Sequence, residues 1–144
     1  MSRHSSDIPL ESLGTLSAKS AAINATATAT ADQIATGYIT TVSTSAVTIT
    51  LPTGTLLGRR LGAQRGTVFN CVFDNTGSSS SGVVTIAVGT NNIQSTMDLE
   101  VTAATASVTP ATITPLTIPH GVTGVHRYTF LFSSPTACTF TRTA

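Results

Sequence analysis

The chain has 144 residues, enough for one domain and too few for two well-formed cores. Only 9% of its residues are charged, against about 25% in an average soluble domain, and the formal net charge is +1. This balance disfavours partners that bind through charge, nucleic acid included. No apolar stretch approaches the roughly 18 residues of a membrane span, and the N-terminal residues lack the apolar core of a secretory signal, so we expect neither.

Threonine makes up about a fifth of the chain, whereas residues that favour helices, such as glutamate, lysine and leucine, are scarce. Threonine is β-branched and suits a pleated, half-buried surface. The composition therefore predicts an all-β protein. It also implies a neutral, hydroxyl-rich surface, which gives little charge repulsion between copies of the chain.

The N-terminal part, residues 1–33, shows little apolar periodicity and includes an alternating Ala/Thr run at Ala25–Ala31. We expect an extended arm that leaves its own domain and adds to a sheet edge of a neighbouring subunit or an underlying shell protein. Leu10, Leu13 and Leu16 would then form a small apolar anchor. The alternative is a flexible tail without a docking site.

After the arm, apolar and polar residues alternate in short segments that are bounded by turn residues. The expected strands are residues 38–42, 47–51, 67–74, 84–88, 99–103, 113–118, 125–132 and 137–142. About eight short strands predict a β-sandwich or barrel for residues 34–144. Of these, we expect an antiparallel, jelly-roll-like sandwich with the extended N-terminal arm.

Several segments carry more detailed expectations. Prolines suit an edge or irregular strand at 113–118, and apolar residues on both faces predict a central strand at 125–132. The glycines in 56–66 limit that stretch to a short helix or a wide loop, and the serine-rich stretch 74–82 predicts a hairpin. The expected core residues are Ile39, Val47, Ile49, Phe69, Phe73, Ile86, Val88, Val101, Phe130 and Phe140.

The chain offers few groups for catalysis or metal binding. Its three histidines and six acids form no metal-ligand or catalytic motif, so we expect no catalytic residue, no metal and no cofactor. The two cysteines, Cys71 and Cys138, lie on expected strand faces beside phenylalanines, which favours inert core thiols. A disulfide between them would require their strands to pair.

Arginine outnumbers lysine, and three arginines, Arg59, Arg60 and Arg65, form the one cationic cluster. Guanidinium groups suit bidentate pairing with carboxylates. We expect this cluster to contact another subunit, where it could meet acids such as Asp7 or Glu11 of the arm.

Several strand and turn segments resemble one class of viral protein: Gly37–Thr41, Ala46–Gly54, Gly66–Phe69, Phe73–Thr76 and Val84–Gly89. They are similar to virion-surface proteins of tailed phages and large DNA viruses, the minor capsid, decoration or fibre-like β-domains. The resemblance covers about residues 33–142 and transfers no functional residue. It implies a small β-sandwich that assembles on a virion as a homo-oligomer, a trimer first, together with a major capsid or other virion protein.

Two other classes remain open from the residues alone. A receptor- or carbohydrate-binding β-domain of a tail fibre or adhesin would share the Thr-rich strands, but it would need exposed aromatic rings for sugar stacking. The chain has no tryptophan, and Tyr38 and Tyr128 are its only tyrosines. An enzyme is the third class, and the missing acid/base constellation weighs against it.

Overall fold

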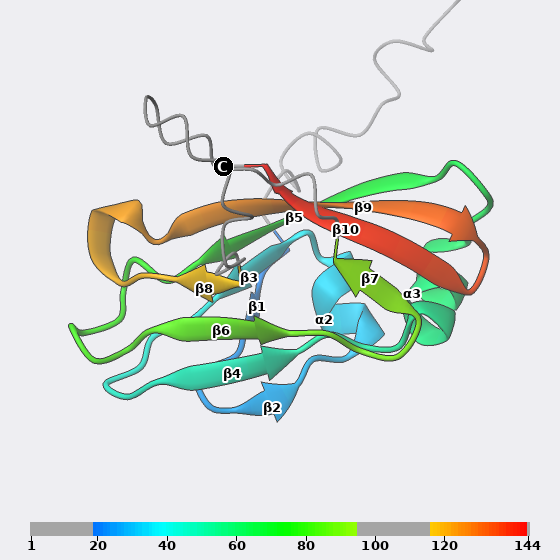
Figure 1. Ribbon diagram of the computed structural model, residues 1–144. Helices are drawn as coiled ribbons and strands as arrows, with labels where there is room; N and C mark the ends of the chain where they lie inside the picture. Colours follow the sequence, from blue (N-terminus) through cyan, green and yellow to red (C-terminus); the bar gives the residue numbers. More distant parts are fainter. Residues whose placement is uncertain (1–18, 95–115, 144) are drawn as a thin grey trace, which may run out of the picture.

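The computed structural model describes residues 19–94 and 116–143, which form two β-sheets with two short helices at one end (Figure 1). The strands are β1 (Ala21–Ala22), β2 (Ala27–Thr28), β3 (Tyr38–Thr40), β4 (Val47–Thr50), β5 (Val68–Asp74), β6 (Val84–Ala87), β7 (Asn92–Gln94), β8 (Thr117–Ile118), β9 (Val125–Ser134) and β10 (Ala137–Thr143). The helices are α2 (Ala31–Ala35) and α3 (Gly54–Leu61), and a 3-10 turn, η1, spans Gly121–Thr123. The all-β sandwich expected from the sequence is confirmed.

Strand pairing is mixed. The six-stranded sheet has the order β1-β3-β5-β9-β10-β7 and the four-stranded sheet has the order β2-β4-β6-β8. Five pairings are parallel and three, β5 with β9, β9 with β10 and β6 with β8, are antiparallel. The first six strands alternate between the sheets, so β1, β3 and β5 lie in one sheet and β2, β4 and β6 lie in the other. Between two successive strands of one sheet the chain runs once along the other sheet, and it therefore has its original direction again when it returns. The expectation of antiparallel pairing throughout is therefore wrong, and the jelly roll, which is built from antiparallel Greek keys, is not confirmed.

Residues 21–33 belong to this domain, so the expectation that they leave it as an arm is wrong. β1 pairs with β3 and β2 pairs with β4, both in parallel, and the backbone N–H of Ala29 donates to the carbonyl of Thr50 at 2.8 Å. Ile23 and Ile34, on either side of the Ala/Thr run, are buried in the common core. Together with Ala29 of the run, which is 1% exposed, the two isoleucines supply the apolar burial that holds this part of the chain in the domain. Residues 1–18, with Leu10, Leu13 and Leu16, lie outside the described residues.

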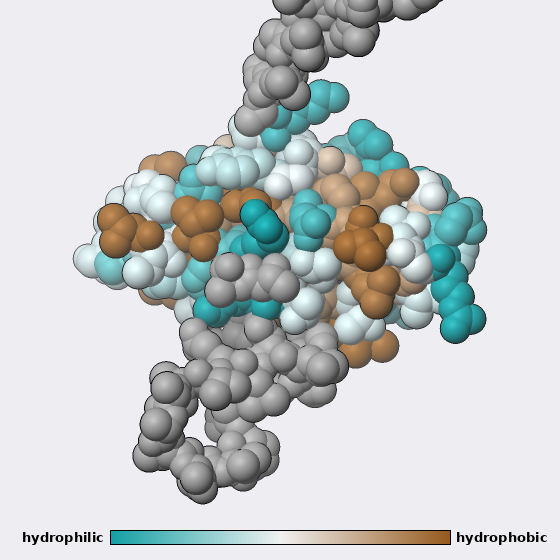
Figure 2. Space-filling model, turned by 90° about the horizontal axis from the view of Figure 1, so that it is seen from above, coloured by the Kyte–Doolittle hydropathy of each residue, from teal (hydrophilic) through white to brown (hydrophobic). Residues whose placement is uncertain are grey.

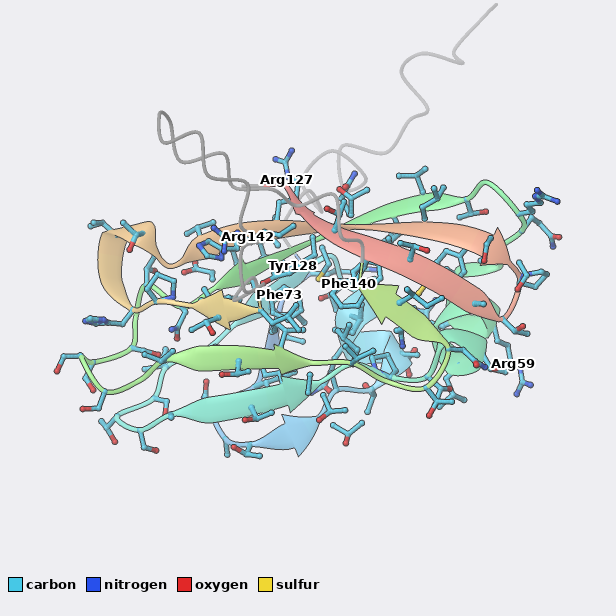
Figure 3. The ribbon with its side chains drawn as sticks, in the orientation of Figure 1. Arg59, Phe73, Arg127, Tyr128, Phe140 and Arg142 are labelled. Atoms are coloured by element: carbon cyan, nitrogen blue, oxygen red, sulfur yellow. The ribbon has the colours of Figure 1, made fainter. Side chains whose placement is uncertain are left out.

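The core lies between the sheets and is rich in aromatic rings. Phe73 meets Tyr128 edge to face with ring centres 5.3 Å apart, and Phe130 stacks on Phe140 at 5.6 Å; Figure 3 shows Phe73, Tyr128 and Phe140 in this interior. Seven of the ten expected core residues are buried: Ile39, Val47, Ile49, Phe73, Ile86, Phe130 and Phe140.

Of the other three expected core residues, two are not buried and one is not described. Phe69 is partly buried against the core, and Val101 lies outside the described residues. Val88 is 45% exposed because β6 ends at Ala87, so the alternation that would bury it no longer applies.

The stretch 56–66, expected to be a short helix or a wide loop, overlaps α3, which begins two residues earlier at Gly54 and ends at Leu61. Thr53 caps its first turn by accepting a hydrogen bond from the backbone N–H of Leu56, and Gly62 ends it with a φ of 62°, in the left-handed region. α3 packs closely on the turn between β9 and β10. A Cβ atom on Gly58 would lie 2.0 Å from the backbone oxygen of Pro135, so only glycine fits at this contact.

The serine-rich stretch 74–82 is not a hairpin, because it joins β5 of one sheet to β6 of the other. Asn75 is buried here, and its side-chain amide donates to the carbonyl oxygens of Gly82, Ile118 and Pro119. These contacts tie the crossover to the segment that contains β8. Turn composition predicts a change of direction, but not whether the next strand pairs with the previous one.

The remaining strand expectations concern the C-terminal half. β9 lies between β5 and β10, which confirms the predicted central strand, and β8 is an edge strand, as its flanking prolines predict. The expected strand 99–103 lies outside the described residues. The sequence pattern did not predict β7, which is only three residues long and lies at one edge of the six-stranded sheet.

Candidate interaction surfaces

The outer face of the six-stranded sheet carries a row of exposed apolar side chains. Strand register places Val68 of β5 opposite Leu131 of β9, Leu131 opposite Thr139 of β10, and Thr139 opposite Ile93 of β7. Opposed residues in paired strands point to the same side of the sheet. Val68, Leu131 and Ile93, which we call the apolar row, therefore lie on one line across the outer face, with the half-buried Thr139 between Leu131 and Ile93.

The apolar row is open to solvent. Val68, Leu131 and Ile93 are 58%, 48% and 63% exposed. Figure 2, which looks down on the six-stranded sheet, shows brown side chains grouped among white and teal ones on this side of the molecule. Single exposed aliphatic residues are ordinary on protein surfaces, but aligned ones on one sheet face mark a candidate contact surface.

The same outer face becomes polar toward the other end of β5. The Tyr38 hydroxyl donates to Asp74 Oδ2 at 2.5 Å, and Thr76 donates to Asp74 Oδ1 through both its backbone N–H and its hydroxyl, at 2.9 and 2.6 Å. Burial by itself would raise the pKa of the Asp74 carboxyl, but the hydrogen bonds from Thr76 and Tyr38 outweigh it and lower that pKa. The pKa of Tyr38 shifts in the opposite direction. Its hydrogen bond to the Asp74 carboxylate raises it, with smaller contributions from burial and from the Asp74 charge.

A second candidate surface is an open groove of about 790 Å³ beside the two helices. Its walls come from the β2–α2 connection, the β4–α3 connection, one side of α3 and the residues just after β6. We call it the helix groove. None of its lining residues is aromatic, so it lacks the ring that a sugar-binding site would use for stacking.

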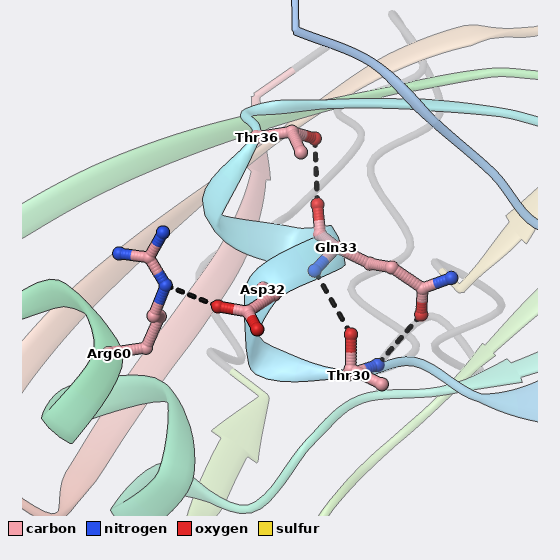
Figure 4. Close-up of polar contacts among 5 residues, drawn as sticks. All are labelled: Thr30, Asp32, Gln33, Thr36 and Arg60. Atoms are coloured by element: carbon pink, nitrogen blue, oxygen red, sulfur yellow. Dashed lines mark hydrogen bonds and ion pairs between the residues drawn. The ribbon is translucent and has the colours of Figure 1, made fainter.

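The helix groove has charged residues at its rim (Figure 4). Arg60 of α3 donates through Nε to Asp32 of α2, and both side chains are more than half exposed, so the pair contributes little to stability. α2 begins at a capping box in which Thr30 and Gln33 exchange hydrogen bonds of 3.1 and 2.9 Å. Arg59 also lines the groove and extends from α3 away from the sheets (Figure 3).

The arginine cluster predicted from the sequence is only partly brought together. Arg59 and Arg60 lie in the last turn of α3 and line the helix groove, whereas Arg65 is exposed in the following loop and does not line it. The partner of Arg60 is Asp32 of the same chain, which the sequence analysis did not consider. The apolar row was also not predicted. Val68 and Leu131 lie on the outward face of predicted strands, and Ile93 lies in β7, which the alternation pattern does not predict.

The two cysteines are buried and unbonded, in agreement with core thiols. β9 lies between their strands, so Cys71 and Cys138 are not on paired strands. Burial raises the pKa of Cys71 to about 12 and that of Cys138 to about 11. Within residues 19–94 and 116–143, no group of three or more His, Cys, Asp or Glu side chains is arranged to hold a metal ion.

In the part of the chain that the structure describes, no helix has the length and apolar character needed to cross a membrane. No protein-family model, no curated protein and no solved structure matches the chain.

Proposed function

We propose that this chain is a non-enzymatic structural protein of a virion, a minor capsid, decoration or spike-base component that assembles as a homo-oligomer. Its partners are other copies of itself, a trimer first, and a major capsid or other virion protein. Its N-terminal residues contribute to these contacts beside the sandwich. The resemblance of the segments around β3 to β6 to virion-surface proteins supports this proposal.

The observation that carries the proposal is the apolar row on the six-stranded sheet. In a monomer, Val68, Leu131 and Ile93 are left largely in water. Burying side chains of this size contributes roughly 1.5–3 kcal/mol each when burial is complete. A sheet face with few charges presents a flat, weakly hydrated surface, which suits packing against another flat surface.

Light scattering of the full-length chain at micromolar concentration tests the proposal, and a stable oligomer is the expected result. Leu131→Lys places a charge in the middle of the apolar row, where association would bury it without a partner. We expect the dissociation constant to rise by at least about thirtyfold, which corresponds to about 2 kcal/mol. Far-UV circular dichroism should show that the variant keeps its β-structure.

Val122→Lys is the matched control, because Val122 is 98% exposed in η1 and does not belong to the apolar row. It introduces the same charge and should leave assembly unchanged. A wild-type chain that stays monomeric would contradict the proposal. Equal weakening by both substitutions would show that the apolar row is not the contact.

A further inference from the structure

The helix groove combines a buried apolar floor with exposed aliphatic walls. Ala29 and Leu51 are each 1% exposed and lie at its base. Leu56 of α3 and Val88 after β6 line it and are 51% and 45% exposed. A segment that brought aliphatic side chains into the groove would cover both at once, with the usual gain from removing apolar surface from water.

The charge at the rim of the helix groove favours an acidic occupant. Asp32 balances Arg60, whereas Arg59 makes no ion pair with any of the described residues. The groove therefore has one uncompensated positive charge beside its apolar walls. β2, whose Thr28 also lines the groove, is one of the two edge strands of the four-stranded sheet, and an extended segment can form main-chain hydrogen bonds with such an edge.

We propose that the helix groove receives residues 7–16 of a second copy of this chain. This segment contains Ile8 and three leucines, together with Asp7 and Glu11, and it has no Lys or Arg. Its aliphatic side chains match the walls formed by Leu56 and Val88, and its acids match Arg59. Only residues 17 and 18 separate this segment from Lys19. At about 3.3 Å per extended residue, Leu16 can lie no more than roughly 10 Å from Lys19, so the groove must belong to a closely packed neighbouring copy.

The choice of a second copy, rather than the groove of the same chain, rests on the proposed function, because a homo-oligomer needs contacts that pass between copies. The inference adds the location and chemistry of one such contact. It also accounts for a cationic helix end and for two exposed aliphatic side chains, Leu56 and Val88, that do not belong to the apolar row.

Disulfide cross-linking between two full-length variants tests the inference. One variant carries Leu13→Cys, the other carries Leu56→Cys, and a C-terminal tag on one of them identifies the mixed dimer. The two native cysteines are buried and should not interfere. The control mixture pairs Leu13→Cys with Val122→Cys, whose position is 98% exposed and outside the groove. We expect the first mixture to cross-link at least about tenfold faster, because a docked pair reacts at a millimolar effective concentration.

A charge exchange provides a second test on the same chains. Arg59→Glu should slow the cross-link severalfold by repelling the acidic segment, and Glu11→Lys in the Leu13→Cys chain should restore most of the rate. Because Arg59 is exposed, its substitution should not affect folding.

The outcomes separate the inference from the proposed function. An oligomer in light scattering with no preference for Leu56→Cys over Val122→Cys overturns the inference and leaves the proposed function standing. Cross-linking only within a chain that carries both Leu13→Cys and Leu56→Cys shows that the groove takes its own segment, and it overturns the choice of a second copy. A monomer with no mixed dimer overturns both.

Discussion

Asn75 joins three parts of the chain at one end of the sandwich, and its removal is the sharpest test of how the two sheets are held together. Its Nδ2 group lies 2.7 Å from the carbonyl oxygen of Gly82, 3.0 Å from that of Pro119 and 3.2 Å from that of Ile118. Its Oδ1 accepts from the Ser78 hydroxyl at 2.5 Å. Asn75→Ala removes all these contacts and leaves carbonyl oxygens facing a small cavity.

The magnitude follows from the number of hydrogen bonds. An amide has two N–H donors, so the three carbonyl contacts amount to two hydrogen bonds, one of them shared, and the Ser78 contact is a third. At about 1 kcal/mol for each buried bond, Asn75→Ala should lower the free energy of unfolding by about 3 kcal/mol. For a chain of this size, the melting temperature should fall by roughly 10 °C.

Urea unfolding followed by far-UV circular dichroism measures this change. Asn70→Ala is the control, because Asn70 is exposed on the outer face. Its side-chain Oδ1 accepts a hydrogen bond from the Thr129 hydroxyl at 2.6 Å. The control should cost about 0.5 kcal/mol. Asn75→Asp has the same shape but lacks the donors, so at neutral pH it should destabilise at least as much as alanine. If Asn75→Ala costs no more than Asn70→Ala, the amide does not hold this end together.

Three further predictions concern Tyr38, two glycines in and just after α3, and the two cysteines. Tyr38→Phe removes a hydrogen bond to the Asp74 carboxylate, so the pKa of that carboxyl should rise in an NMR titration. Since a lowered carboxyl pKa contributes stability that is present above the ordinary pKa and lost as the pH falls, the variant should lose less stability in acid. Gly58→Ala should destabilise strongly in thermal melts, whereas Gly62→Ala, with open space around it, should cost only about 1 kcal/mol of backbone strain; equal losses would contradict the close packing of α3. At about pH 8 both cysteines should resist a thiol reagent in the folded chain and react in urea; rapid labelling without urea would show that the core opens readily.

Local patterns in the sequence were sufficient to predict β3 to β6, β8 to β10 and much of the core, but not β1, β2 or β7. Alternation places Ile39, Ile49 and Phe73 on the buried face of their strands, whatever the neighbouring strands are. The abundance of threonine and the scarcity of helix formers likewise indicate β-structure without reference to topology. Arg59 and Arg60 were predicted from charge and spacing to contact another subunit. The structure places both on one groove, and the contact itself stays a prediction.

Tertiary structure alone decided which strands pair, in which direction and in which register. Period-two patterning specifies which face of a strand is buried, but it says nothing about the neighbour on either side. For this reason the crossovers between sheets, the parallel pairing and the inclusion of residues 21–33 could not be predicted. The apolar row exists only because register aligns Val68, Leu131 and Ile93, which are far apart in sequence. The helix groove likewise depends on α2 and α3 meeting at one end of the sandwich, because non-local packing, rather than local preference, brings its walls together.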